Sequence, residues 1–174
     1  MPGRGVESMF LLTARNQINL SSIADNKSNI LISVNTIIIS IVLTVLVSRF
    51  AEYPNIILPS LVFLTFSLIT IIFAILSTRP NISSGTFTKD DIKEKKVNLL
   101  FFGNFYNMGL DDYDWALGEM MKDDDYLYST MIKDQYFLGK VLAKKYKLLR
   151  KAYDFFMVGI ILSVIAYVLA FMNF

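Results

Sequence analysis

The chain contains neither histidine nor cysteine among its 174 residues. These absences exclude disulfides, zinc sites built from Cys and His, thiolate nucleophiles and imidazole bases. A hydrolase would then need a carboxylate pair or a serine–lysine dyad, but the aspartates at 111–114 and 123–125 are explained more simply as helix starts and solvated surface. No P-loop, Gly-x-Gly-x-x-Gly or calcium-loop motif occurs. We therefore expect a protein that is not an enzyme and holds no metal or cofactor.

Charged residues are missing from three long apolar runs, at 30–47, 56–76 and 155–171. A helix crosses the hydrocarbon core of a bilayer, about 30 Å thick, with roughly 17–25 residues. The runs therefore predict transmembrane helices over residues 30–49, 56–78 and 153–173. The hydrophobic content of 54% agrees with a membrane protein, since soluble domains have about 45–50%.

Basic residues are unevenly distributed around these runs. The turn between the first two runs has one, Arg49, beside Glu52, whereas the approach to the third run has five: Lys144, Lys145, Lys147, Arg150 and Lys151. Basic residues favour the cytoplasmic side. The pattern predicts a multi-pass membrane protein with a cytoplasmic N-terminal helix (1–29), a cytoplasmic helical domain (79–152) and an external C-terminus. The net charge of +2 argues neither for nor against nucleic acid, and we expect none as a partner.

Glycine and proline are scarce, and none occurs from Val6 to Tyr53. One helix is therefore expected from the N-terminal region through the first span. A second long helix is expected from the aspartates at 123–125 into the third span, because carboxylates favour helix N-termini. Shorter helices are predicted over 89–96 and 110–122, and loops over 83–85 and 103–109. The fold class is all-α, with a cytoplasmic helical domain formed by extensions of the long helices.

Small and polar side chains form stripes on these helices. In the first, the stripe comprises Arg15, Asn19, Ser22, Asn26, Asn29, Ser33, Ser40 and Thr44. Its intramembrane part favours helix packing over a water path in an oligomer, because no ionisable residue lies inside the span. Gly159, Ser163, Ala166 and Ala170 in the third span, and Ser60, Ser67 and Ala74 in the second, predict packing faces.

Two charged residues, Asp134 and Lys145, fall on the apolar face of the second long helix. A charge on a buried face needs a partner. They are too far apart along one helix to pair with each other, so each is expected to meet either a structural ion-pair partner or a ligand. The segment 98–106 concentrates aromatic residues around a glycine; it suits a core, a membrane interface or a surface on which a planar base stacks.

Several segments resemble one family. They are the run 24–31 (ADNKSNIL) entering the first span, 98–105 (NLLFFGNF), 125–128 (DYLY) and Lys145-Tyr146 with Leu149-Arg150. Over about residues 10–172 the chain resembles the Pycsar transmembrane effectors, the PycTM family. The resemblance implies a bacterial anti-phage role, in which a partner nucleotide cyclase makes a cyclic nucleotide, most simply a cyclic pyrimidine mononucleotide, and the effector impairs the inner membrane to cause abortive infection.

We accordingly predict a homo-oligomeric membrane effector that binds this nucleotide. Basic side chains would neutralise its phosphate, and amides and aromatic rings would hold its base. The predicted ligand-binding residues are Arg15, Asn26, Lys27, Phe102, Asn104, Phe105, Tyr126, Asp134, Lys145 and Arg150. Two alternatives remain: a small ligand-independent channel or holin-like pore, and a passive membrane scaffold subunit.

Overall fold

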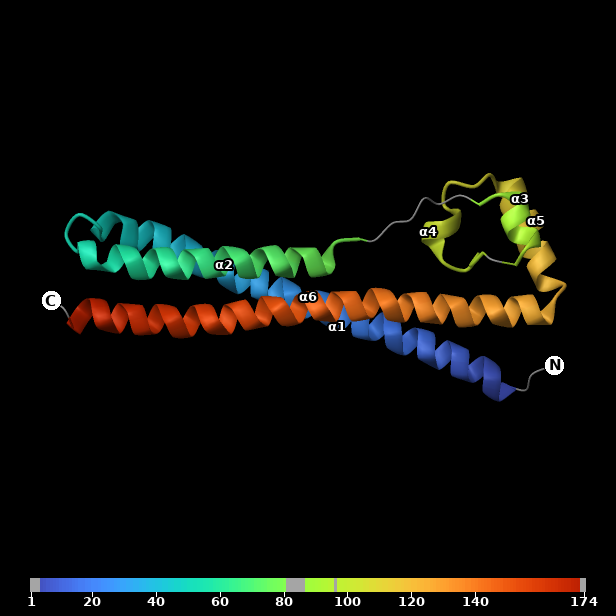
Figure 1. Cartoon of the computed structure of the whole chain (residues 1–174), viewed down its shortest axis with the longest axis horizontal. Coiled ribbons are helices and arrows are strands. Elements are labelled where there is room, and N and C mark those ends of the chain that lie inside the picture. The colour runs from blue at the N-terminus through green and yellow to red at the C-terminus, as the bar shows by residue number, and fades with distance from the viewer. Residues whose placement is uncertain (1–3, 81–86, 96, 173–174) are drawn as a thin grey trace. The chain divides into compact units, whose positions relative to one another are not determined.

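The computed structural model describes residues 4–80, 87–95 and 97–172, which form helices and connections without a strand (Figure 1). The long helices are α1 (Arg4–Ile41), α2 (Ile57–Thr78) and α6 (Asp124–Met172), and the short ones are α3 (Lys89–Lys93), α4 (Phe102–Phe105) and α5 (Leu110–Met121). The all-α fold class is confirmed for this part of the chain. The loop predicted over 83–85 lies outside the described residues.

Three helical segments are long and apolar enough to cross a membrane: Arg4–Arg49, Pro54–Thr78 and Asp124–Met172. The first comprises α1, a π-helical turn (Val42–Leu46) and a 3₁₀ turn (Val47–Arg49), and the second begins with the 3₁₀ turn Pro54–Ile56. The three spans predicted from the apolar runs therefore correspond to three helices.

Local sequence explains where the helices begin and end. The Asp123 carboxylate accepts from the Tyr126 amide at 3.0 Å and caps α6, as the aspartate run predicted. Thr88 and Asp91 form a capping box on α3. Arg79 is extended before Pro80, which ends α2. The predicted loop over 103–109 is wrong in part, because residues 102–105 form the short helix α4.

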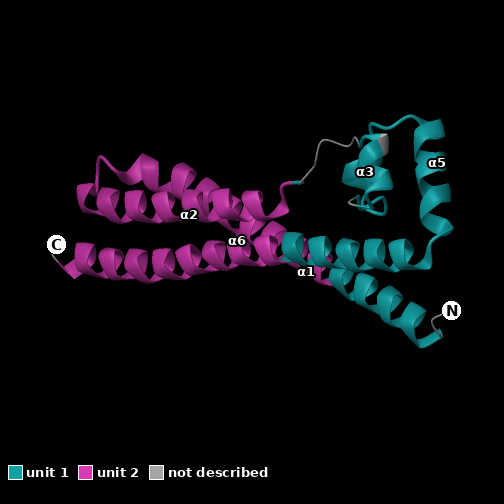
Figure 2. Cartoon of the chain, turned by 45° about the vertical axis from the view of Figure 1, so that its right-hand side comes forward, with its two compact units in different colours: residues 1–19, 80–142 teal, residues 20–79, 143–174 magenta. Residues whose placement is uncertain are grey.

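The chain divides into two compact units (Figure 2). Unit 1 comprises residues 1–19 and 80–142, and unit 2 comprises residues 20–79 and 143–174. Helices α1 and α6 each contribute residues to both units, because neither helix is interrupted at the boundary.

Unit 1 has a small hydrophobic core. Its buried members are Ile92, Val97, Leu99, Ala116, Met120 and Tyr126. In the same unit two glutamine side chains join α1 to α6: Gln17 donates to the Gln135 carbonyl at 3.2 Å, and Gln135 donates to the Phe10 carbonyl at 2.9 Å. The buried residues of the core come from α3, the segment after it, α5 and the start of α6, so the core joins these elements.

Unit 2 packs α1, α2 and α6 side by side (Figure 1). Its buried members are Ala24, Leu31, Ala74, Leu149 and Ala152. Gly159 of α6 is so close to α2 that an added Cβ would lie 2.5 Å from the Phe66 Cβ. Ser163, Ser60, Ser67 and Ala74 are also buried. The small-residue faces predicted on the second and third spans are therefore confirmed as packing faces.

The polar stripe of α1 behaves differently. Its members in the apolar run, Ser33, Ser40 and Thr44, are exposed, and α1 instead packs through the face that carries Ala24, Ser28, Leu31 and Asn35. The predicted packing of this stripe does not hold within one chain.

Candidate functional site

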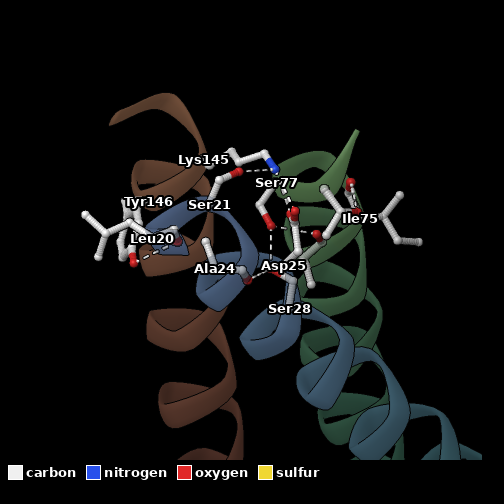
Figure 3. Close-up of polar contacts among 11 residues, drawn as sticks. Leu20, Ser21, Ala24, Asp25, Ser28, Ile75, Ser77, Lys145 and Tyr146 are labelled. Carbon is white, nitrogen blue, oxygen red and sulfur yellow. Dashed lines mark hydrogen bonds and ion pairs between the residues drawn. The ribbon is translucent and has the colours of Figure 1, made fainter. Parts of the chain in front are cut away.

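An ion pair joins α1 to α6 in unit 2, just before both helices enter their apolar runs (Figure 3). The Lys145 ammonium donates to both carboxylate oxygens of Asp25 at 2.8 Å and to the Ser21 hydroxyl at 2.9 Å. The Lys145 side chain is 17% exposed and that of Asp25 is 37% exposed. Lys145 thus has an ion-pair partner, as expected for a charged residue on the apolar face of a helix.

Further polar contacts surround this pair. We call the pair and these contacts together the juxtamembrane cluster, which comprises Ser21, Asp25, Ser28, Ser77, Lys145 and Tyr146. The hydroxyls of Ser28 on α1 and Ser77 on α2 lie 2.5 Å apart, and both residues are buried. The Tyr146 hydroxyl donates to the Leu20 carbonyl at 3.2 Å. All three long helices of unit 2 are therefore tied together at one level (Figure 3).

Helical spacing explains the α1 side of the cluster. Ser21, Asp25 and Ser28 are separated by four and three residues, so they lie on one face. Sequence reasoning missed Asp25 as a functional residue. Its signal was a charge opposite in sign to Lys145 that, like Lys145, precedes an apolar run.

A second polar residue missed from sequence is Asn35, which is fully buried in unit 2. Its amide nitrogen donates to the Leu31 carbonyl at 2.8 Å, while its side-chain oxygen is buried without a partner. A buried amide oxygen without a hydrogen bond is costly, so Asn35 differs from four buried serines of unit 2 whose hydroxyls form hydrogen bonds, namely Ser28, Ser60, Ser77 and Ser163.

Asn98 forms hydrogen bonds with two of the predicted site residues of unit 1. Its side-chain amide donates to Asp134 at 3.0 Å, and its backbone carbonyl accepts from the Asn104 side chain at 2.9 Å. Asn98 is itself buried. Asp134 and Asn104 are therefore brought together through a third residue, and Asp134, like Lys145, has a protein partner.

The predicted aromatic residues are not gathered in one surface. Phe102 is 58% exposed, and the Phe105 ring stacks on Tyr113 with ring centroids 4.5 Å apart. Tyr126 belongs to the unit 1 core, at 3% exposure, and burial raises the pKa of its hydroxyl. The hydroxyl therefore stays protonated at neutral pH and is a potential donor.

The ten predicted ligand-binding residues divide between the units. Unit 1 contains Arg15, Phe102, Asn104, Phe105, Tyr126 and Asp134, and unit 2 contains Asn26, Lys27, Lys145 and Arg150. Arg15, Asn26, Lys27 and Arg150 are exposed. Only Asn104 and Asp134 are linked through hydrogen bonds to a common residue. Nucleotide binding by the ten stays a prediction.

One further ion pair lies in unit 1, between Lys95 and Asp123. The hydrogen bond to Asp123 raises the pKa of Lys95, and the same bond lowers the pKa of Asp123. Lys133 also donates to the Lys95 carbonyl at 2.8 Å. Two contacts therefore hold Lys95 against the start of α6.

Comparison with protein families identifies the chain. The model of the Pycsar effector protein domain, PycTM, matches residues 9–171. The chain belongs to the Pycsar effector family. No match is found among curated proteins or among solved structures. The family resemblance inferred from the sequence motifs is confirmed.

Family membership, together with three apolar helices, makes the chain a membrane effector of anti-phage defence. Pycsar systems in general use a cyclic nucleotide signal made by a nucleotide cyclase. In this Pycsar effector the juxtamembrane cluster lies where α1 and α6 meet their apolar runs, which suits coupling between helices.

Proposed function

We propose that this Pycsar effector is activated by a cyclic pyrimidine mononucleotide and then impairs the bacterial inner membrane, so that an infected cell dies before the phage matures. The nucleotide would come from a partner cyclase. Family membership supports the class of signal, and the three apolar helices support the target.

The observation that carries the proposal is the continuity of α6. This helix runs without interruption from Asp124 to Met172, so it includes both the capped start in unit 1 and the third apolar run in unit 2. We propose that a change at its start passes along this hydrogen-bonded helix, because no loop interrupts α6 between its start and the apolar run. Helix α1 has the same property over Arg4–Ile41.

We further propose that the active form is a homo-oligomer with the N-terminus and unit 1 in the cytoplasm. The exposed polar stripe of α1 supports contact between copies, because Ser33, Ser40 and Thr44 face away from their own unit. Small hydroxylated residues allow transmembrane helices to approach closely.

Dye release from liposomes tests this function. The full chain is reconstituted into phosphatidylethanolamine–phosphatidylglycerol vesicles that enclose a self-quenching dye. Cyclic cytidine monophosphate or cyclic uridine monophosphate is then supplied on both faces. We expect rapid release with a cyclic pyrimidine nucleotide and none with linear cytidine monophosphate or with protein-free vesicles.

The other outcomes support the alternatives. Release without nucleotide would favour a ligand-independent pore. Intact vesicles under every condition, with the protein shown to be inserted, would favour a passive scaffold subunit.

A further inference from the structure

A cavity of about 320 Å³ opens in unit 1 beside the start of α6. Binding sites for small molecules occupy roughly 300–1,000 Å³, so this one suits a single small ligand. Its lining residues come from α3, the turn after it, α5 and α6: Ile92, Lys93, Lys95, Trp115, Glu119, Lys122, Asp123 and Tyr126.

Three of the lining residues are lysines and two are carboxylates. The third lysine, Lys93, pairs at 3.8 Å with Asp90, which is not a lining residue. Lys95 pairs with Asp123 and Lys122 pairs with Glu119, and the side chains of both pairs are at least one-third exposed. Exposed ion pairs contribute little to stability. A phosphate can therefore replace a carboxylate as the partner of either lysine at small cost.

The cavity also offers aromatic surface and a buried donor. Trp115 and Tyr126 both line it. Trp115 is partly exposed and suits stacking of a planar base, whereas the Tyr126 ring is 3% exposed. The Tyr126 hydroxyl is buried, and within the described residues no group forms a hydrogen bond with it. A ligand atom that accepts this hydrogen would satisfy a group that the protein leaves unpaired.

We infer that this cavity binds a mononucleotide-sized anionic ligand, with its phosphate on Lys95 and Lys122, its base against Trp115 and one acceptor atom at the Tyr126 hydroxyl. The inference rests on the proposed function for the identity of the ligand, a cyclic pyrimidine nucleotide. Of the ten residues predicted from sequence, only Tyr126 lines this cavity.

Binding here acts on α6 directly. Asp123 caps the helix by accepting from the Tyr126 amide, and its second oxygen pairs with Lys95. A phosphate that replaces Asp123 as the partner of Lys95 changes the contacts of Asp123, the residue that caps α6. The ligand would thus alter the cytoplasmic end of the helix whose other end is the third span.

Trp115 reports binding, because it is the only tryptophan in the sequence. Its fluorescence is recorded on the full chain in detergent micelles while cyclic cytidine monophosphate is added. We expect saturable quenching in the wild type. The variant Lys122→Gln, which removes one phosphate partner, should weaken binding at least about tenfold, the factor that corresponds to about 1.4 kcal/mol.

Two further variants sharpen the assignment. Tyr126→Phe keeps the ring and removes only the unpaired hydroxyl, so it should weaken binding while circular dichroism and thermal unfolding stay as in the wild type. Lys147→Gln removes an exposed lysine of unit 2 that is not in the cavity. It should bind like the wild type and controls for net charge.

Each result is decisive. No quenching in the wild type, or equal affinity of Lys122→Gln, Tyr126→Phe and the wild type, overturns the assignment. Equal affinity of those two variants combined with loss of binding in Lys145→Met would move the site to the juxtamembrane cluster. Quenching that obeys the predicted variant pattern without dye release from liposomes keeps the cavity assignment and rejects the proposed function. Dye release that stays unchanged in both variants keeps the proposed function and rejects the cavity assignment.

Discussion

Lys145 and Asp25 form a bidentate ion pair between α6 and α1, with the ammonium nitrogen 2.8 Å from each carboxylate oxygen. The residues are 120 positions apart in the sequence, and Ser21 provides a third acceptor for Lys145. The side chains of both residues are partly exposed to solvent. Its contribution should therefore fall between those of buried and surface ion pairs.

Breaking this pair should destabilise unit 2 without unfolding the chain. We expect Lys145→Met or Asp25→Asn to lower the free energy of unfolding by about 1–3 kcal/mol, because each leaves one charged or polar group without its partner. Thermal unfolding in detergent measures the effect.

A charge exchange supplies the control. The double variant Asp25→Lys with Lys145→Asp should recover a substantial part of the loss, since Ser21 can serve either charge. If the loss in the double variant equals the sum of the losses in the single variants Asp25→Lys and Lys145→Asp, the two residues do not interact in the folded protein.

Gly159 should not tolerate a side chain. A Cβ there would lie 2.5 Å from the Phe66 Cβ, an atom fixed to the α2 backbone. Gly159→Ala should cost about 1–3 kcal/mol through overpacking. Gly118→Ala is the matched control, because nothing lies within 4 Å of its added Cβ, and alanine favours a helix over glycine by about 1 kcal/mol. Equal unfolding temperatures for the two variants would contradict the close approach of α6 and α2.

The Lys95–Asp123 pair should make stability depend on pH at the acid end. The pKa of Asp123 is lowered in the fold, so its contribution is present above the unfolded pKa of about 3.9 and is lost as pH falls through the folded value. The pKa of Lys95 is raised, so its contribution is complete below about 10.4 and is lost as pH rises through the folded value.

Asp123→Asn tests this, because asparagine still caps a helix but has no charge. The variant should be less stable than the wild type by a constant amount from about pH 5 to about pH 9. The difference should vanish in acid, as the wild-type carboxylate becomes neutral. A difference that persists unchanged after Asp123 is protonated would show that charge is not its cause.

The absence of cysteine makes the topology directly testable. We expect a cysteine at Glu52, in the turn between the first two spans, to react with a membrane-impermeant maleimide in intact cells. A cysteine at Leu110, which is 79% exposed in unit 1, should react only after the membrane is permeabilised, because the charge distribution predicts a cytoplasmic location for that unit. The reverse labelling pattern would invert the orientation.

The sequence by itself determined the helices and the candidate spans. Length and hydrophobicity of an apolar run are local properties, and so are the carboxylate that caps α6 and the proline that ends α2. Family membership was also readable, because its motifs are short stretches such as 24–31 and 98–105.

Only the tertiary structure decided the partners. Helical spacing showed that Lys145 and Asp134 needed them, yet Asp25 and Asn98 became their partners because the helix rotations and the path of the chain brought them close. Tyr126 was predicted to bind the ligand, and packing placed it in the core and beside the cavity. Such contacts join residues distant in sequence, and their energies depend on the mutual placement of helices, which no local pattern specifies.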